Sequence, residues 1–270
     1  MSKRNRTMTD HAKRVLTAFI AVPLLVAAVL VAPFWALTIV IMGATLLAVH
    51  EFYAMLRPPV SKAIVVVTDL LIVCLFLSLL RTEMLFIALL PFFTMSVLTV
   101  FLFTYRKDQR KSGDLGRILI GPFYICLPLL FFLLIAGLPR GKTWILFILA
   151  VIFAGDTGSF YVGRWLGKHK LTPISPGKTW EGSVGGLLAN GISAAIFGSL
   201  FFPALSLISV VVLGIGLGIS GQVGDLAESL LKRISNIKDS GTVLPGHGGL
   251  LDRIDSLLFA IPVLYLYLSL

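Results

Sequence analysis

Long apolar runs alternate with short polar segments along most of the chain. Nine runs are dominated by Leu, Ile, Val, Phe and Ala; they cover 15–33, 35–55, 63–80, 84–104, 118–138, 143–163, 183–202, 205–221 and 254–270. A helix of about 20 apolar residues can cross the hydrocarbon core of a bilayer. The pattern therefore predicts an all-α, polytopic integral membrane protein with about nine transmembrane helices.

Composition agrees with a membrane protein. The chain has 270 residues, of which 57% are hydrophobic and only 13% are charged, and its mean hydropathy is +0.95. A soluble domain of this length would carry far more charge. The two cysteines, Cys74 and Cys126, fall inside predicted spans, which favours buried thiols over a disulfide framework.

The basic residues are distributed unevenly between the two sides of the predicted membrane protein. When alternate connecting segments are assigned to opposite sides, only three of the 23 Lys and Arg residues, Arg81, Arg140 and Lys142, fall on the side opposite the N-terminus. The positive-inside rule then predicts a cytoplasmic N-terminus and a C-terminus on the outer side of the cell membrane. The net charge of +10 is expected to face anionic headgroups of the lipid bilayer, and no nucleic-acid partner is expected.

Polar residues gather in the second half of the chain. Seven of the 13 acidic residues lie between 156 and 255. They belong to two polar segments, 153–182 and 221–256, which the alternation places on the cytoplasmic side. We therefore predict an N-terminal transmembrane scaffold over 1–140 and a C-terminal catalytic half over 141–270, with these segments as its cytoplasmic loops.

The residue types in the two polar segments suit phosphate chemistry. Glycine allows backbone N–H groups to approach a phosphate, Lys and Arg neutralise its charge, and carboxylates hold Mg²⁺. On a helix, Asp225, Glu228 and Ser229 would share a face with Lys232, and Asp252 and Asp255 repeat the carboxylate spacing. These residues could hold one or two metal ions, although acids near helix N-termini also act as simple caps.

Several other polar residues leave alternatives open. Two "GKT" sequences lack the glycine that a phosphate-binding P-loop needs, so Lys178 is a candidate phosphate contact without that architecture. His247, in "PGHGG", could donate to a phosphate, act as an acid or base, or only stabilise a turn. His50, Glu51 and Asp69 lie in predicted spans, where interfacial snorkelling or helix–helix hydrogen bonding is favoured over a functional role.

The stretch "SLLKRISNIKDSGTVLPGHGGLLDRIDS", residues 229–256, resembles the characteristic motif of the phosphatidate cytidylyltransferase, or CDP-diglyceride synthetase, family. Every fixed element of that motif is present, from Ser229 and the Lys232–Arg233 pair to Asp252, Arg253 and Asp255. The upstream segments "GDTGSFYVGRWLGK" and "ISPGKTWEG" also look like that family. The resemblance covers roughly the C-terminal half, and the first half agrees mainly in hydropathy and in "HEFY".

The resemblance implies an enzyme that makes CDP-diacylglycerol and pyrophosphate from CTP and phosphatidic acid. It also implies Mg²⁺, K⁺ as a second cation, and a homodimer. The positions that match the family's metal-binding aspartates are Asp225 and Asp252, with Glu228 and Asp255 as further candidates. The catalytic candidates are Asp225, Asp252, Lys232, Arg233, Lys238 and Asp239. The candidate contacts to the phosphates of CTP or phosphatidic acid are Asp156, Lys178, Ser229, His247, Gly248, Gly249 and Arg253.

Three alternative functions predict different sequence features. A CTP-dependent polyprenol or lipid kinase would share the membrane site, CTP and Mg²⁺, but the long motif argues against it. A CDP-alcohol phosphotransferase needs a D-G-x-x-A-R pattern, which the chain lacks. A transporter would place its carboxylates near the middle of the bilayer, whereas these cluster at one face.

Overall fold

The computed structural model describes residues 26–27, 29–56, 59–80, 83–104, 112–237, 240–241 and 248–270, and its named elements are all α-helices. They are α2 (Phe34–Met55), α3 (Lys62–Leu79), α4 (Glu83–Thr104), α5 (Ser112–Gly137), α6 (Gly141–Leu166), α7 (Trp180–Phe201), α8 (Leu207–Ile234) and α9 (Leu251–Ser269). Most of the predicted run 15–33 lies outside the described residues, as do Lys238, Asp239 and His247.

Six of these helices are long and apolar enough to cross a membrane: α2, α3, the segment Leu115–Gly137 of α5, α6, α7 and α8. The chain is therefore an all-α integral membrane protein. Helices α4 and α9 also coincide with predicted runs, but α9 carries Asp252, Arg253 and Asp255 in its first two turns. The count of nine spans and the sidedness of the termini stay predictions.

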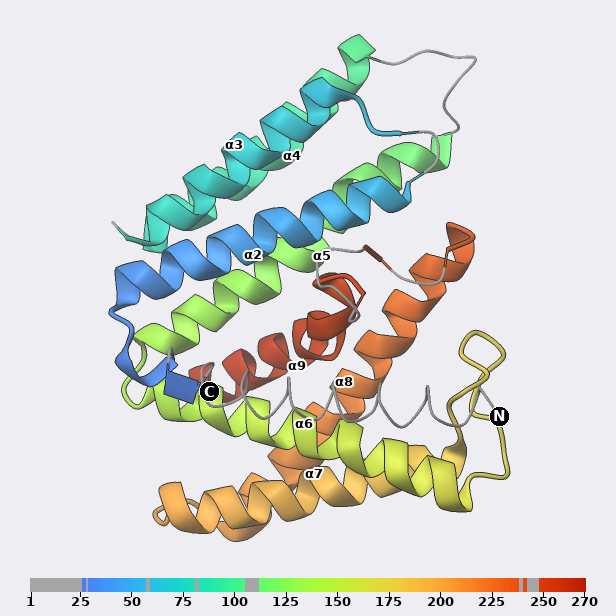
Figure 1. Ribbon diagram of the computed structural model, residues 1–270. Coiled ribbons are helices and arrows are strands. Elements are labelled where there is room, and N and C mark those ends of the chain that lie inside the picture. Colours follow the sequence, from blue (N-terminus) through green and yellow to red (C-terminus); the bar gives the residue numbers. More distant parts are fainter. Residues whose placement is uncertain are drawn as a thin grey trace.

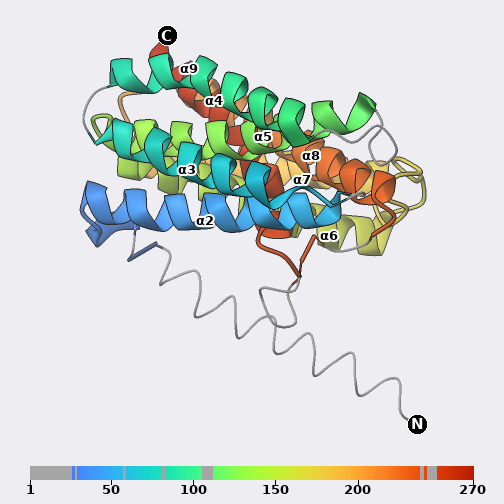
Figure 2. The ribbon, with the colours of Figure 1, turned by 90° about the horizontal axis from the view of Figure 1, so that it is seen from above.

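The helices form a layered bundle in which the C-terminal half surrounds the candidate site. In Figure 1, α3 and α4 pair at one edge, α2 and α5 lie next to them, and α6 and α7 pair at the opposite edge. Helices α8 and α9 pack on each other between these pairs, and α9 also contacts α5. Figure 2 shows the same bundle from above, with α2, α3 and α4 in successive layers.

Glycines allow α6 and α7 to pack backbone against backbone. A Cβ added at Gly158 would lie 2.7 Å from Cβ of Ala189, and one added at Gly185 would lie 2.5 Å from Val162. Such small-residue contacts are a common way for membrane helices to approach closely. The buried Asn190 strengthens the same seam, because its Nδ2 donates to the carbonyl oxygen of Val151 at 3.2 Å.

The observed contacts bring together helix ends that the predicted alternation places on the same side of the membrane. Lys142 Nζ donates to the carbonyl oxygens of Leu30 and Ala32 at 2.8 Å each, so the start of α6 lies beside the residues that precede α2. At the other end of the bundle, Lys178 contacts Asp225 near the end of α8. Among the described residues, Lys142 therefore lies at one end of the bundle, and the lysines and arginines that surround the candidate site lie at the other.

The predicted sidedness has a direct test. In a variant without Cys74 and Cys126, a cysteine placed at the exposed Ala204 should react with a membrane-impermeant maleimide added to intact cells, because the alternation puts the α7–α8 connection outside. A cysteine placed at the exposed Lys170 should react only after the cells are opened. Reaction of both cysteines in intact cells would contradict the predicted orientation.

The two predicted polar loops are largely helical, which corrects their description as loops. Helix α6 continues through Leu166 and α7 begins at Trp180, so only 167–179 of the first segment connects helices. Helix α8 continues to Ile234, well beyond the predicted end at 221. The hydropathy pattern underestimated the length of these helices because it marks only where the sequence becomes polar. The helices continue beyond that point, since the backbone hydrogen bonds of a helix also form between polar residues.

Candidate active site

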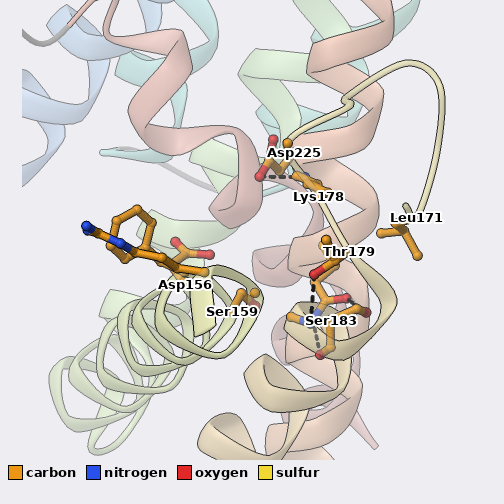
Figure 3. A pocket seen from close by; sticks show the side chains of 13 residues that line it. Asp156, Ser159, Leu171, Lys178, Thr179, Ser183 and Asp225 are labelled. Carbon is orange, nitrogen blue, oxygen red and sulfur yellow. Dashed lines mark hydrogen bonds and ion pairs between the residues drawn. The ribbon is translucent and has the colours of Figure 1, made fainter. Parts of the chain in front are cut away.

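A cavity of about 620 Å³ opens between α6, α7, α8 and the connection 167–179. Asp156 and Ser159 reach it from α6, Ser183 from α7 and Asp225 from α8, while Lys178 comes from the connection (Figure 3). Charged groups lie beside neutral hydroxyl groups in one cavity. The polar segments predicted to work together therefore meet in the fold.

Lys178 and Asp225 form the charged pair of this cavity. Lys178 Nζ lies 2.6 Å from Asp225 Oδ2, and both side chains are partly exposed. The loop that carries Lys178 is closed on itself, because the Leu171 amide donates to the Lys178 carbonyl oxygen at 3.0 Å. Thr179 then caps α7 by accepting a hydrogen bond from the Gly182 amide at 3.1 Å. The ammonium group is thus held in the wall of a preformed cavity.

A second carboxyl group anchors the start of the same loop. Glu181, in the first turn of α7, lies 2.6 Å from Nδ1 of His169 through its Oε1 atom. It also accepts hydrogen bonds from the amides of Lys168 and His169 at 3.1 and 3.3 Å. Sequence reasoning assigned no role to this pair. The available signal was an acid two residues after the Thr179 cap, a position that favours negative charge.

Lys232 joins two carboxyl groups at the end of α8. Its Nζ atom lies 2.6 Å from Glu228 Oε2 and 2.7 Å from Asp252 Oδ1. Glu228 is fully buried, and its Oε1 atom has no hydrogen-bond partner among the described residues. The predicted helical face of α8 and the first turn of α9 therefore meet, as expected, with Lys232 between them.

Asp252 is held by backbone groups as well as by Lys232. Its Oδ2 atom accepts hydrogen bonds from the amides of Ser240 at 3.1 Å and Gly249 at 2.9 Å. Burial would raise the pKa of Asp252, but hydrogen bonds from Lys232, Glu228 and these amides outweigh it and lower the pKa to about 2. Asp252 therefore remains negatively charged throughout the physiological pH range.

The glycines before α9 fit this arrangement closely. Gly248 has a φ of +80°, in the left-handed region that favours glycine. A Cβ added at Gly249 would lie 2.0 Å from Ser240 Oγ and 2.6 Å from Oε2 of Glu51. The phosphate contacts at these glycines stay a prediction, and the geometry gives both residues a structural reason to be glycine.

The remaining predicted residues lie around these two clusters. Ser229 Oγ lies 3.5 Å from Asp225 Oδ1, at the limit of a hydrogen bond. Arg233 Nε donates to the carbonyl oxygen of Ile174 at 3.2 Å, which joins the end of α8 to the first polar loop. Asp255 is buried and accepts from the Ser256 amide at 2.6 Å, while Arg253 is exposed in the first turn of α9.

The donor set suits a magnesium ion that is held jointly with a substrate. No three His, Cys, Asp or Glu side chains in the described part of the chain are placed to hold a metal ion by themselves. Mg²⁺ is commonly bound by one or two carboxylates together with substrate phosphates and water. Asp225 and the unpartnered Oε1 of Glu228 supply oxygen donors of this kind, and Lys178 and Lys232 supply positive charge beside them.

A helical membrane bundle with the Lys178–Asp225 pair in a cavity, and a second cluster of Lys232, Glu228 and Asp252 where α8 meets α9, fits a class: a membrane-embedded enzyme that handles phosphate groups. Comparison with known proteins narrows this class. Residues 12–270 match the cytidylyltransferase family, so the chain belongs to that family and is a nucleotidyltransferase.

Three similar proteins carry the same name. Over 192 residues the chain is 40% identical to a phosphatidate cytidylyltransferase of Bacillus subtilis (strain 168), an alignment that covers 70% of this chain and 69% of that protein. A phosphatidate cytidylyltransferase of Brucella suis biovar 1 is 44% identical over 165 residues, or 59% of each chain. One from Staphylococcus saprophyticus is 45% identical over 130 residues, which cover 48% of this chain and 50% of that protein.

Proposed function

We infer that the protein is a CTP:phosphatidate cytidylyltransferase, which makes CDP-diacylglycerol and pyrophosphate from CTP and phosphatidic acid. The observation that carries this inference is the match of nearly the whole chain to the cytidylyltransferase family. The cavity supports it, because Lys178, Asp225 and Asp156 meet there at the end of the helices. A soluble nucleotide and a lipid headgroup could both reach such a position.

The reaction needs charge neutralisation more than a strong base. An oxygen of the phosphatidic acid phosphate attacks the α-phosphorus of CTP, and a new P–O bond forms. The bond from that phosphorus to the bridging oxygen of the β-phosphate breaks, and pyrophosphate leaves with the electron pair. A phosphate monoester is already ionised near neutral pH, so its oxygen is ready to attack.

The residues of the chain would position the two anions. Lys178, which lines the cavity, and Lys232 and Arg233, at the end of α8, are the cations assigned to the phosphates. Because both lysines are held by carboxyl groups, their ammonium groups are already in place when the substrates arrive. Such preorganised charges stabilise the negative charge that develops on the transferred phosphoryl group.

Asp225 and Asp252 are the residues we assign to Mg²⁺, with Glu228 and Asp255 as further carboxyl donors. When bound, the ion would neutralise phosphate charge that the lysines alone cannot reach. K⁺ as a second cation, a homodimeric assembly and an active site on the cytoplasmic side of the cell membrane belong to the same proposal. They rest on the resemblance of the motif and on the distribution of basic residues.

Two labelled nucleotides test the reaction and separate it from its rivals. With phosphatidic acid in detergent micelles, label at the α-phosphate of CTP should appear in a lipid product, because cytidylyl transfer retains that phosphate. Label at the γ-phosphate should appear in pyrophosphate. Transfer of γ-label to a lipid would instead indicate a kinase, and no transfer of either label would contradict both enzyme assignments.

A further inference from the structure

Glu51 lies in the N-terminal half of the chain but contacts the segment that carries Asp252. It is near the end of α2 and only 5% exposed. Its Oε1 atom accepts a hydrogen bond from the Leu250 amide and its Oε2 atom accepts one from the Leu251 amide, each at 2.9 Å. These amides belong to the first turn of α9, where donors have no partner within the helix. A side chain from far along the sequence thus caps α9.

The same carboxyl group also binds the segment before α9. Ser240 Oγ donates to Oε2 of Glu51 at 3.3 Å, while the Ser240 amide donates to Asp252. A Cβ at Gly241 would lie 2.6 Å from Oε1 of Glu51, so glycine is needed there for the close approach. Glu51 therefore contacts both described segments that donate to Asp252, the one at Ser240 and the one at the start of α9.

We propose that Glu51 is a positioning residue for the catalytic site: it fixes the start of α9 and the Ser240 segment, and thereby holds Asp252 against Lys232. Among the described residues, the amides of Ser240 and Gly249 donate to Oδ2 of Asp252, and Lys232 contacts its Oδ1 atom. Helix α2 thus contributes directly to the geometry of a site whose other members all come from the C-terminal half.

The Glu51→Gln variant is the sharpest test. An amide nitrogen in place of one carboxyl oxygen would point a donor at a backbone N–H, so the cap would lose a hydrogen bond without losing volume. We expect kcat per folded molecule to fall roughly 10- to 100-fold, because small displacements of catalytic groups have effects of this size. The Michaelis constants should change much less. Glu51→Asp, which keeps both acceptors on a shorter side chain, should recover part of the activity.

Tyr53→Phe is the matched control on the same helix. The Tyr53 hydroxyl group hydrogen-bonds to Thr68 at 3.0 Å and to the carbonyl oxygen of Ile118 at 3.2 Å, and neither contact touches the α9 turn. This variant should lower the melting temperature but keep wild-type kcat per folded molecule. Equal losses of kcat in Glu51→Gln and Tyr53→Phe would contradict a specific role for Glu51, as would a Glu51→Gln enzyme with wild-type kcat.

The kinetic test rests on the proposed cytidylyl transfer. Hydrogen exchange does not depend on that reaction and therefore tests the role of Glu51 separately. In the full-length protein, peptides that cover 248–254 should exchange faster in Glu51→Gln than in wild type or Tyr53→Phe, because the Leu250 and Leu251 amides lose their acceptor. Should Glu51→Gln fail to fold, Gly241→Ala replaces it, since its methyl group would push the carboxyl group away. Unchanged exchange in these peptides would overturn the proposal even if the wild-type protein showed no turnover with CTP.

Discussion

Asp225→Asn and Asp252→Asn should each lower turnover of CTP and phosphatidic acid by at least ~10²-fold. Each change removes a negative charge while nearly preserving shape, so it weakens both the proposed Mg²⁺ site and the hold on a lysine, Lys178 or Lys232. Loss of one strong electrostatic contact to a transition state has about this effect. Steady-state kinetics over a range of Mg²⁺ concentrations would measure it.

Asp69→Asn is the matched control for both variants. Asp69 also pairs with a basic residue, His50, at 2.9 Å, but it lies on α3, away from the cavity. It should keep wild-type turnover. If Asp225→Asn and Asp252→Asn behaved like Asp69→Asn, with lower melting temperatures but normal turnover per folded molecule, the carboxyl groups would be structural caps and the metal assignment would be wrong.

Lys232→Met should lower both stability and activity, and the two effects can be separated. Removal of the ammonium group leaves Glu228 and Asp252 side by side without a cation, and Glu228 is fully buried. Breaking a buried ion pair by removing one partner costs about 3 kcal/mol of folding free energy. Turnover should fall ~10²-fold if the same group neutralises substrate phosphate.

The double variant Lys232→Met/Glu228→Gln tests this separation. Removal of the buried acid should restore much of the lost stability, measured as a melting temperature, but none of the lost turnover. Lys142→Met is the control at the opposite end of the bundle, where Lys142 donates to the Leu30 and Ala32 carbonyl oxygens. Recovery of full turnover in the double variant would mean that Lys232 acts only by balancing charge.

Hydropathy located the helices well where a helix and an apolar run coincide. The predicted run 35–55 corresponds to Phe34–Met55, and 84–104 corresponds to Glu83–Thr104. It failed at α8, because Asp225, Glu228 and Lys232 continue a helix that is no longer apolar. The spacing of those residues already indicated a shared helical face, and the contacts between Lys232, Glu228 and Asp252 agree with it.

Contacts between distant parts of the chain could not be read from local patterns. For Glu51 the sequence favours snorkelling or a helix–helix hydrogen bond, since its sequence neighbours do not indicate that it meets Leu250 and Leu251. Similarly, both Lys178 and Asp225 were singled out as polar residues, but their 2.6 Å contact depends on how α8 packs beside the first polar loop. Which acid pairs with which lysine is decided by tertiary packing.

The glycine seam between α6 and α7 determines which wall of the cavity can move. Because α6 and α7 approach too closely at Gly158 and Gly185 to admit even a methyl group, this seam leaves little room for rearrangement. Helix α8 is fastened to it through Gln222, whose Nε2 atom donates to the Ser183 carbonyl oxygen at 3.0 Å. The remaining wall is the connection 167–179, which is tied to α8 twice, by the salt bridge between Lys178 and Asp225 and by the hydrogen bond from Arg233 to the Ile174 carbonyl oxygen. An incoming triphosphate that drew Lys178 away from Asp225 would break only the first tie, so the connection would stay attached to α8 while the lysine changed partners.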